Sequence, residues 1–78
     1  MNGLELQAER VRKGRSRRDI AEKLGLNYDA YLRKEKGYSR FSPQQIIIVS
    51  KELELTADKI NMIFFDNQLP IGRKRKTG

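Results

Sequence analysis

Arginine and lysine are the residues of this chain with the clearest chemical potential. The 78 residues include 17 Lys and Arg against ten Asp and Glu, which gives a formal net charge of +7 at pH 7. A basic excess of this size on so short a chain favours a polyanionic partner, and nucleic acid fits better than a membrane surface. The chemistry to expect is therefore the binding of phosphate groups.

Catalysis has little support in the sequence. The chain contains neither His nor Cys, and it lacks a Gly-rich phosphate loop. Its carboxylates are scattered singly, so no cluster has the spacing of a metal site or of a paired acid and base. We therefore expect a protein that is not an enzyme and that needs no cofactor, metal or small-molecule ligand.

The length predicts one small domain. A chain of 78 residues has a marginal core unless it forms a compact helical bundle or gains stability from a partner. No stretch approaches the ~20 apolar residues of a membrane span, and the first residues do not resemble a signal peptide. We expect a soluble protein without a membrane partner.

The most informative segment is residues 16–37, SRRDIAEKLGLNYDAYLRKEKG. Its first half has apolar residues at the spacing of a buried helical stripe, namely Ile20, Ala21 and Leu24. Ser16 is suited to the N-cap of this helix, and Asp19 places a negative charge in its first turn. Gly25 can adopt the left-handed conformation that ends a helix.

A second short helix is predicted directly after this turn. Leu26 returns to the core, Asn27 is the N-cap, and the helix runs to about Lys36 before Gly37 stops it. Two short helices joined by a Gly-centred turn form a helix-turn-helix unit, which places its second helix in the major groove of DNA.

Three further helices are expected around this unit. The first covers Gly3 to about Lys13, with Leu6 and Val11 facing inward and Gly14 as its stop. The fourth opens at Ser42 and Pro43, and its inner face comprises Ile46, Val49, Ser50 and Leu53. The fifth opens at Thr56, and its inner face comprises Ile60, Ile63 and Phe64.

The end of the chain lacks the helical pattern of the preceding segments. Pro70 and Gly72 break the helical pattern, and the basic run 73–76 has nothing apolar to bury. We expect a DNA-binding domain over residues 1–68 and a basic, disordered tail over residues 69–78.

Together these features resemble the Cro/repressor-type helix-turn-helix family of phage and bacterial transcription regulators. The matching residues between Leu4 and Phe65 are Arg10, Lys13, Gly14, Ser16, Ile20, Ala21, Leu24, Gly25, Leu26, Tyr31, Glu35, Gly37, Ser42, Pro43, Leu53, Ile63 and Phe64. The resemblance implies an all-α, compact five-helix bundle of the lambda-repressor-like DNA-binding type, with the second and third helices as the helix-turn-helix. Because no second domain follows, a short Cro-like repressor of a phage or prophage is expected, located in the bacterial cytoplasm or nucleoid.

The resemblance also implies that the third helix contacts base edges, through Asn27, Tyr28, Asp29, Leu32 and Arg33. Arg33 can form a bidentate contact with O6 and N7 of guanine, and Leu32 suits a thymine methyl group. Asp29 has two open alternatives: it accepts a hydrogen bond from cytosine N4, or it pairs with Arg33 four residues on.

Phosphate contacts are expected around the start of the second helix, from Ser16 and Arg17, and in or after the turn that follows the third, from Lys36, Tyr38 and Arg40. Arg17 stands where relatives commonly carry Gln, and it would add a charge-assisted contact to a helix N-terminus. The alternative is that Arg17 is a solvated residue of the first turn. Arg15 stands where relatives usually carry an apolar residue, so one residue covering the core is missing or rearranged.

Two further roles follow from the resemblance. Arg10 and Glu35 resemble a structural ion pair that joins the first helix to the end of the third, although their types alone predict exposed charges of little energetic value.

Large apolar residues are left over outside the assigned helix faces, namely Ile47, Ile48, Met62 and Phe65. In the family the fifth helix lies near the two-fold axis of dimers on DNA.

We therefore expect Met62 and Phe65 to contribute to a homodimer on a double-stranded DNA operator, with half-sites about 34 Å apart. The alternative is that both residues are simply buried. A competing hypothesis is a small regulatory protein that acts by binding another repressor or recombinase, and the leftover apolar residues also fit it. RNA binding ranks below both, because no aromatic stacking platform is recognisable.

Overall fold

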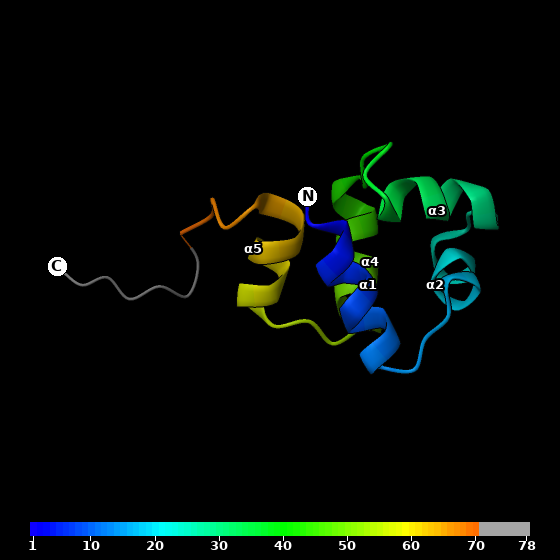
Figure 1. Cartoon of the computed structure of the whole chain (residues 1–78), viewed down its shortest axis with the longest axis horizontal. Helices are drawn as coiled ribbons and strands as arrows, with labels where there is room; N and C mark the ends of the chain where they lie inside the picture. Colours follow the sequence, from blue (N-terminus) through cyan, green and yellow to red (C-terminus); the bar gives the residue numbers. More distant parts are fainter. Residues whose placement is uncertain (71–78) are drawn as a thin grey trace, which may run out of the picture.

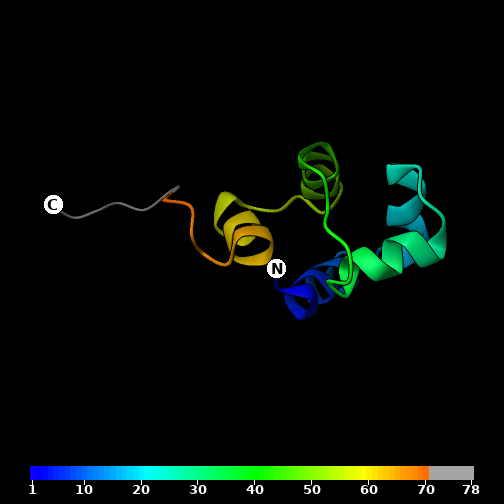
Figure 2. The ribbon, with the colours of Figure 1, turned by 90° about the horizontal axis from the view of Figure 1, so that it is seen from above.

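A computed structural model describes residues 1–70, which form five helices and no strand. The helices are α1 (Gly3–Arg12), α2 (Arg17–Leu24), α3 (Tyr28–Glu35), α4 (Pro43–Glu52) and α5 (Ala57–Phe65). In Figure 1, α1 and α4 lie in the middle, α2 and α3 at one end and α5 at the other. The helices α1 and α4 overlap in Figure 1, but the view from above in Figure 2 shows that they are separate from each other. The all-helical, five-helix prediction is confirmed, and the basic run 73–76 lies outside the described residues.

The helices begin where the sequence supplies N-caps. The side-chain oxygens of Ser16, Asn27, Ser42 and Thr56 each accept a hydrogen bond from the backbone N–H three residues on, as predicted. Asn2 does the same for α1. At α2 and α4 the third residue of the helix also accepts from the backbone of the cap, which completes a capping box.

The core lies between all five helices. Its buried apolar residues are Leu6, Ile20, Ala21, Tyr31, Phe41, Val49, Leu53 and Ile63. The rings of Tyr31 and Phe41 meet edge to face with their centroids 6.2 Å apart, and Phe41 meets Phe64 in the same way at 5.4 Å. The predicted inner face of α2 is thus confirmed, and those of α4 and α5 are confirmed for their apolar residues except Ile60, which is half-buried and outside the core. No helix within residues 1–70 is long and apolar enough to cross a membrane.

The predicted inner face of α1 is wrong at one position. Val11 is 61% exposed, whereas the charged residues Glu9 and Arg10 are buried beside Leu6. Val11 follows Leu6 by roughly one and a half turns, so it emerges on the opposite side of the helix. Glu9 and Arg10 follow Leu6 by one turn and share its face. Their burial is possible because each has an ionic partner.

The chain stays ordered just beyond the predicted domain boundary. The side-chain amide of buried Asn61 donates to the carbonyl of Leu69 at 2.6 Å and accepts from its N–H at 2.9 Å. This pair of bonds holds the segment after α5 against the helix, so the fold extends at least to Leu69.

The start of α1 lies against the end of α3. A Cβ atom placed on Gly3 would lie 2.3 Å from the backbone carbonyl oxygen of Glu35. The N–H of Asn2 also donates to the carbonyl of Ile63 in α5 at 2.7 Å. Gly3 therefore permits a close backbone approach that a larger residue would prevent.

Replacing Gly3 with Ala should destabilise the fold, although Ala normally favours a helix. The added methyl group must push apart two backbones, and overpacking of this kind costs about 1–3 kcal/mol. Thermal unfolding followed by circular dichroism should report a lower Tm. Leu4→Ala, on the exposed side of the same helix, is the control and should change stability by less than about 0.5 kcal/mol. An unchanged Tm for Gly3→Ala would contradict the close approach.

Candidate nucleic-acid interface

A tight turn sets α3 across α2. Gly25 caps the end of α2 in the left-handed conformation, with φ +71°. The N–H of Leu26 then donates to the carbonyl of Ala21 at 2.9 Å, and Leu26 packs against the core. Asn27 caps α3 immediately afterwards, because its Oδ1 accepts from the N–H of Ala30 at 2.7 Å. The predicted turn is confirmed, and α3 lies at the outer edge of the molecule (Figure 1).

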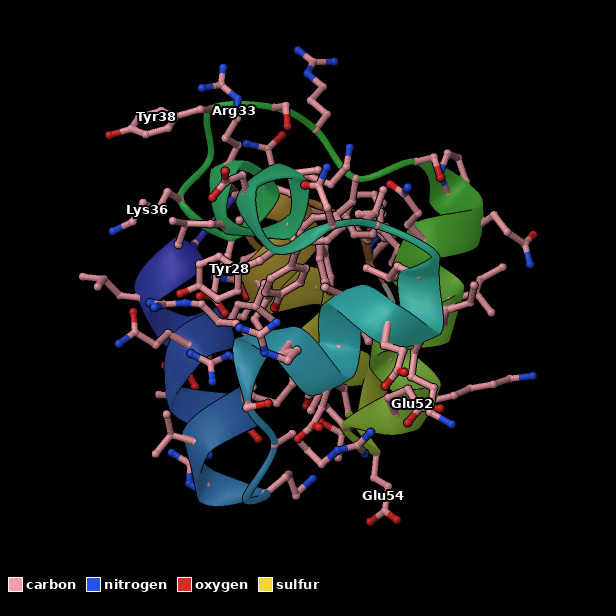
Figure 3. All side chains as sticks on the ribbon, turned by 90° about the vertical axis from the view of Figure 1, so that its right-hand side faces the viewer. Tyr28, Arg33, Lys36, Tyr38, Glu52 and Glu54 are labelled. Atoms are coloured by element: carbon pink, nitrogen blue, oxygen red, sulfur yellow. The ribbon has the colours of Figure 1, made fainter. Side chains whose placement is uncertain are left out.

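One side of α3 is buried and the other is open to solvent. Tyr31 and Glu35 point into the core. Of the residues expected to contact bases, Asn27, Tyr28, Asp29 and Arg33 are exposed, whereas Leu32 is half-buried. Figure 3 looks onto this end of the molecule, where Arg33 and Tyr28 project from different sides of α3. These residues thus share one helix but not one side of it, and Asn27 already uses its oxygen as a cap.

Of the two alternatives for Asp29, the pairing with Arg33 does not occur. Within residues 1–70 no ion pair joins them. The guanidinium carbon of Arg33 lies instead 5.9 Å from the centre of the Tyr38 ring. An exposed ion pair within a helix contributes little, so a cation–π contact can replace it.

The inner end of α3 carries a buried carboxylate. Glu35 is 2% exposed, and its Oε2 accepts from Arg10 Nε at 2.8 Å and from the Tyr31 hydroxyl at 3.0 Å. Its other oxygen, Oε1, accepts from Arg17 Nε at 2.6 Å. The predicted ion pair between Arg10 and Glu35 is therefore confirmed, and two further donors complete it. We call Arg10, Arg17, Tyr31 and Glu35 the Glu35 network.

Burial and hydrogen bonding act in opposite directions on the pKa of Glu35. Burial alone would raise this pKa, but the hydrogen bonds and charges of Arg10 and Arg17 lower it below the ordinary value. Burial and the charge of Glu35 raise the pKa of the Tyr31 hydroxyl. At neutral pH the carboxylate is therefore charged and the phenol is a neutral donor.

Arg17 has a contact that sequence reasoning missed. Besides its bond to Glu35, its Nη1 lies 3.5 Å from the Tyr28 hydroxyl. Its side chain keeps about a quarter of its surface exposed, at 25%. Arg17 is thus not a freely solvated residue of the first turn. No signal in the sequence links it to Glu35, which lies 18 residues away.

The expected phosphate contacts lie at the start of α2 and at and beyond the end of α3. Ser16 uses its hydroxyl to cap α2, while Lys36, Tyr38 and Arg40 are exposed at and beyond the end of α3. Two basic residues outside the prediction also lie close by. The Arg18 guanidinium lies 5.8 Å from the centre of the Tyr28 ring, and Lys34 Nζ donates to the carbonyl of Arg40 at 2.6 Å.

Arg15, at the position where the sequence analysis expected an apolar residue, has a structural role. Its Nη2 contacts Glu52 Oε1 at 2.8 Å, and its Nη1 donates to the Glu52 carbonyl at 3.2 Å. The carbonyl of Arg15 in turn accepts from Arg10 Nη1 at 2.9 Å. The expected apolar cover is thus replaced by a polar link between the α1–α2 turn and the end of α4.

An apolar groove lies between α4, α5 and the loop before α4, and Arg40 of that loop also lines it. Its volume is about 700 Å³, and its apolar lining comprises Met1, Phe41, Pro43, Ile46, Ile47, Phe64 and Phe65. Ile47 is 49% exposed, whereas Ile48, Met62 and Phe65 are half-buried. The predicted dimer residue Phe65 lines the groove, and Met62 is not among its lining residues.

Within residues 1–70 no three His, Cys, Asp or Glu residues are grouped so that they could hold a metal ion. Comparison with known proteins found no matching family model, no matching curated protein and no matching solved structure. A function for this surface therefore rests on its residues and their geometry.

Replacing Glu35 with Gln should destabilise the protein most strongly at neutral pH. The change leaves Arg10 without its carboxylate, and breaking a buried ion pair costs about 3–5 kcal/mol. Because the folded-state pKa of Glu35 is lowered, its contribution is present above the ordinary Glu pKa of about 4.3 and disappears as the pH falls through the lower folded value. Urea unfolding between pH 7 and pH 3 should show the gap between the two proteins shrinking with acid.

The matched control is Glu22→Gln, an exposed residue of α2, which should change stability little at any pH. A gap between Glu35→Gln and the unaltered protein that stays constant down to pH 3 would contradict the lowered pKa.

Proposed function

We propose that this chain is a sequence-specific regulator of transcription that binds double-stranded DNA, with α2 and α3 acting as a helix-turn-helix. In this proposal α3 lies in the major groove, and the regulator is of the Cro-like repressor type. The observation that carries the proposal is the open face of α3, where polar and charged side chains project from a helix that is anchored on its other side.

The chemistry of this face suits base edges. Arg33 has no carboxylate partner within residues 1–70, so its guanidinium is available for O6 and N7 of guanine. Asp29 is likewise not neutralised inside the helix, which supports its role as an acceptor from cytosine N4. Exposed Tyr28 begins the helix and can reach a base or a phosphate.

Basic groups lie near the end of α3, where they can meet the phosphates that line a groove. Arg17 donates through Nε to Glu35, so the outer donors of its guanidinium can still meet a phosphate. Lys36 directly follows Glu35, and both Lys36 and Arg40 are exposed. The buried Glu35 carboxylate supports this arrangement, because it holds α3 and the side chain of Arg17 in one orientation.

A second copy of the chain is the partner that we propose alongside DNA. One small module makes few base contacts, and two half-sites about 34 Å apart on the duplex are the usual solution. The apolar groove supports this partner, because Ile47 and Phe65 both line it and Ile47 is half exposed. We propose that Phe65 contributes to the contact, with Met62 beside it on α5.

A second candidate function has its own observation. On α1, Leu4 is 81% exposed and Val11 is 61% exposed, and the two are two helical turns apart. An exposed apolar stripe of this kind fits a small regulator that binds another repressor or recombinase. The two functions separate in a DNA-binding experiment.

The chain should bind duplex DNA with a steep dependence on salt. A gel shift with the DNA that flanks its own gene should give an affinity that falls between 50 and 200 mM salt, because each neutralised phosphate contributes about −0.9 to the logarithmic slope. Lys36→Ala should reduce this slope by about one. Lys51→Ala, in the last turn of α4, is the control and should leave the slope unchanged.

If the chain bound no duplex at 50 mM salt, or bound with a slope near zero, the DNA proposal would fail. The protein-binding alternative would then be the better explanation of the exposed residues on α1.

Replacing Phe65 with Ser should abolish cooperative binding to paired half-sites and leave binding to a single half-site intact. The reason is that Phe65 is half-buried and lines the groove rather than the centre of the core. Gel shifts on duplexes with one and two half-sites measure the difference, and Leu4→Ser on α1 is the control. If Phe65→Ser instead loses its helical circular dichroism signal at room temperature, Phe65 belongs to the core and the interface is wrong.

A further inference from the structure

The chain makes a defined turn where α3 ends. Gly37 is in the left-handed conformation with φ +87°, directly after the cap residue Lys36. Its N–H donates to the carbonyl of Lys34 at 3.1 Å, and the N–H of Tyr38 donates to the carbonyl of Arg33 at 2.8 Å. These two bonds together form a Schellman motif. The direction in which the chain leaves α3 is therefore fixed by backbone hydrogen bonds.

A Schellman motif brings the residue after the left-handed glycine back over the helix. The two side chains that usually meet in this motif are the third residue before the cap and the second residue after it. Here they are Arg33 and Tyr38, and the Arg33 guanidinium carbon lies 5.9 Å from the ring centre. Figure 3 shows both side chains at the same edge of the molecule. An apolar contact is thus replaced by a cation–π contact.

The surroundings leave this contact as the main restraint on Arg33. Arg33 is exposed and has no ion-pair partner within residues 1–70, and Asp29, one turn earlier, does not bond to it. Tyr38 is 70% exposed. A free arginine samples many rotamers, and each one that points away from the base weakens recognition.

We propose that Tyr38 is a positioning residue that holds Arg33 ready for a bidentate contact with a base. Tyr38 thereby sets how strongly the open face of α3 prefers one sequence over another. This role rests on the proposed function, and it differs from a phosphate contact by the Tyr38 hydroxyl. In the positioning role the aromatic ring of Tyr38 acts on Arg33, whereas in a phosphate contact the Tyr38 hydroxyl would bind the phosphate.

The size of the effect follows from the strength of an exposed cation–π contact. Such a contact corresponds to about a two- to fivefold change in an equilibrium constant. Tyr38→Leu removes the ring but keeps an apolar side chain for the turn, whereas Tyr38→Phe keeps the ring and removes the hydroxyl. The pair of variants therefore separates the two roles.

The first measurement uses the free protein and needs no DNA. Proton NMR should show the side-chain protons of Arg33 shifted upfield by the ring current of Tyr38. Tyr38→Leu should remove the shift and Tyr38→Phe should keep it. Tyr28→Leu, which removes the other tyrosine that lies against an arginine, is the control and should leave the Arg33 signals in place. Arg33 signals without a ring-current shift in the unaltered chain would overturn the proposal.

The second measurement uses a pool of duplexes with a randomised central segment, selected by binding and then sequenced. Arg33→Ala identifies the base position that Arg33 prefers, because that preference alone should flatten. Tyr38→Leu should weaken the preference at the same position by about two- to fivefold, and Tyr38→Phe should match the unaltered chain. In the Arg33→Ala background, Tyr38→Leu should cause no further change there.

Three outcomes of this second measurement would overturn the positioning role. Equal loss on all sequences by both Tyr38→Leu and Tyr38→Phe would assign the hydroxyl to a phosphate. If Tyr38→Leu enriches the same sequence as strongly as the unaltered chain, the positioning role alone fails. If the unaltered chain enriches no sequence, the proposed function fails and the positioning role fails with it. Circular dichroism of each variant confirms that the helices are retained.

Discussion

The buried carboxylate of Glu35 is the constraint on which the arrangement of the first three helices depends. A charge that is 2% exposed is costly unless it is paired and hydrogen-bonded. Its partners come from three helices, with Arg10 from α1, Arg17 from α2 and Tyr31 from α3 itself. All three must therefore reach one point, and a helix that shifted would leave a buried charge unsatisfied. This requirement fixes the orientation of the first three helices and also stabilises their packing.

The same end of α3 is fixed by steric contact and by backbone hydrogen bonds. The backbone of Gly3 approaches the Glu35 carbonyl so closely that no side chain fits between them. Two residues later the turn at Gly37 folds the chain back toward Arg33. Electrostatic, steric and backbone restraints thus act within a few residues of one another. Helix α3 is therefore held firmly along one side, while the residues on its other side make few contacts that stabilise the fold.

The local features of the fold were predictable from the sequence, and the ionic contacts were largely not. Caps such as Ser16 and Asn27 and stripes such as Ile20 and Leu24 depend on neighbouring residues, so periodicity finds them. Tertiary contacts decide which charges are buried, and a pattern of residue types does not contain that information. The bond of Arg17 to Glu35 was missed for this reason. The pair of Arg10 and Glu35 was found only through the family resemblance.

The open face of α3 has a consequence for how such a chain can change over time. Asp29, Arg33 and Lys36 are exposed and form no ion pair with the rest of residues 1–70, so substitutions there cost the fold little. The anchoring residues lie on the opposite side of the same helix and are unaffected by such substitutions. Selection can therefore change the exposed side of α3 without changing its anchored side. Substitutions at these three positions would therefore alter the charge and hydrogen-bonding groups of this surface before they altered whether the chain folds.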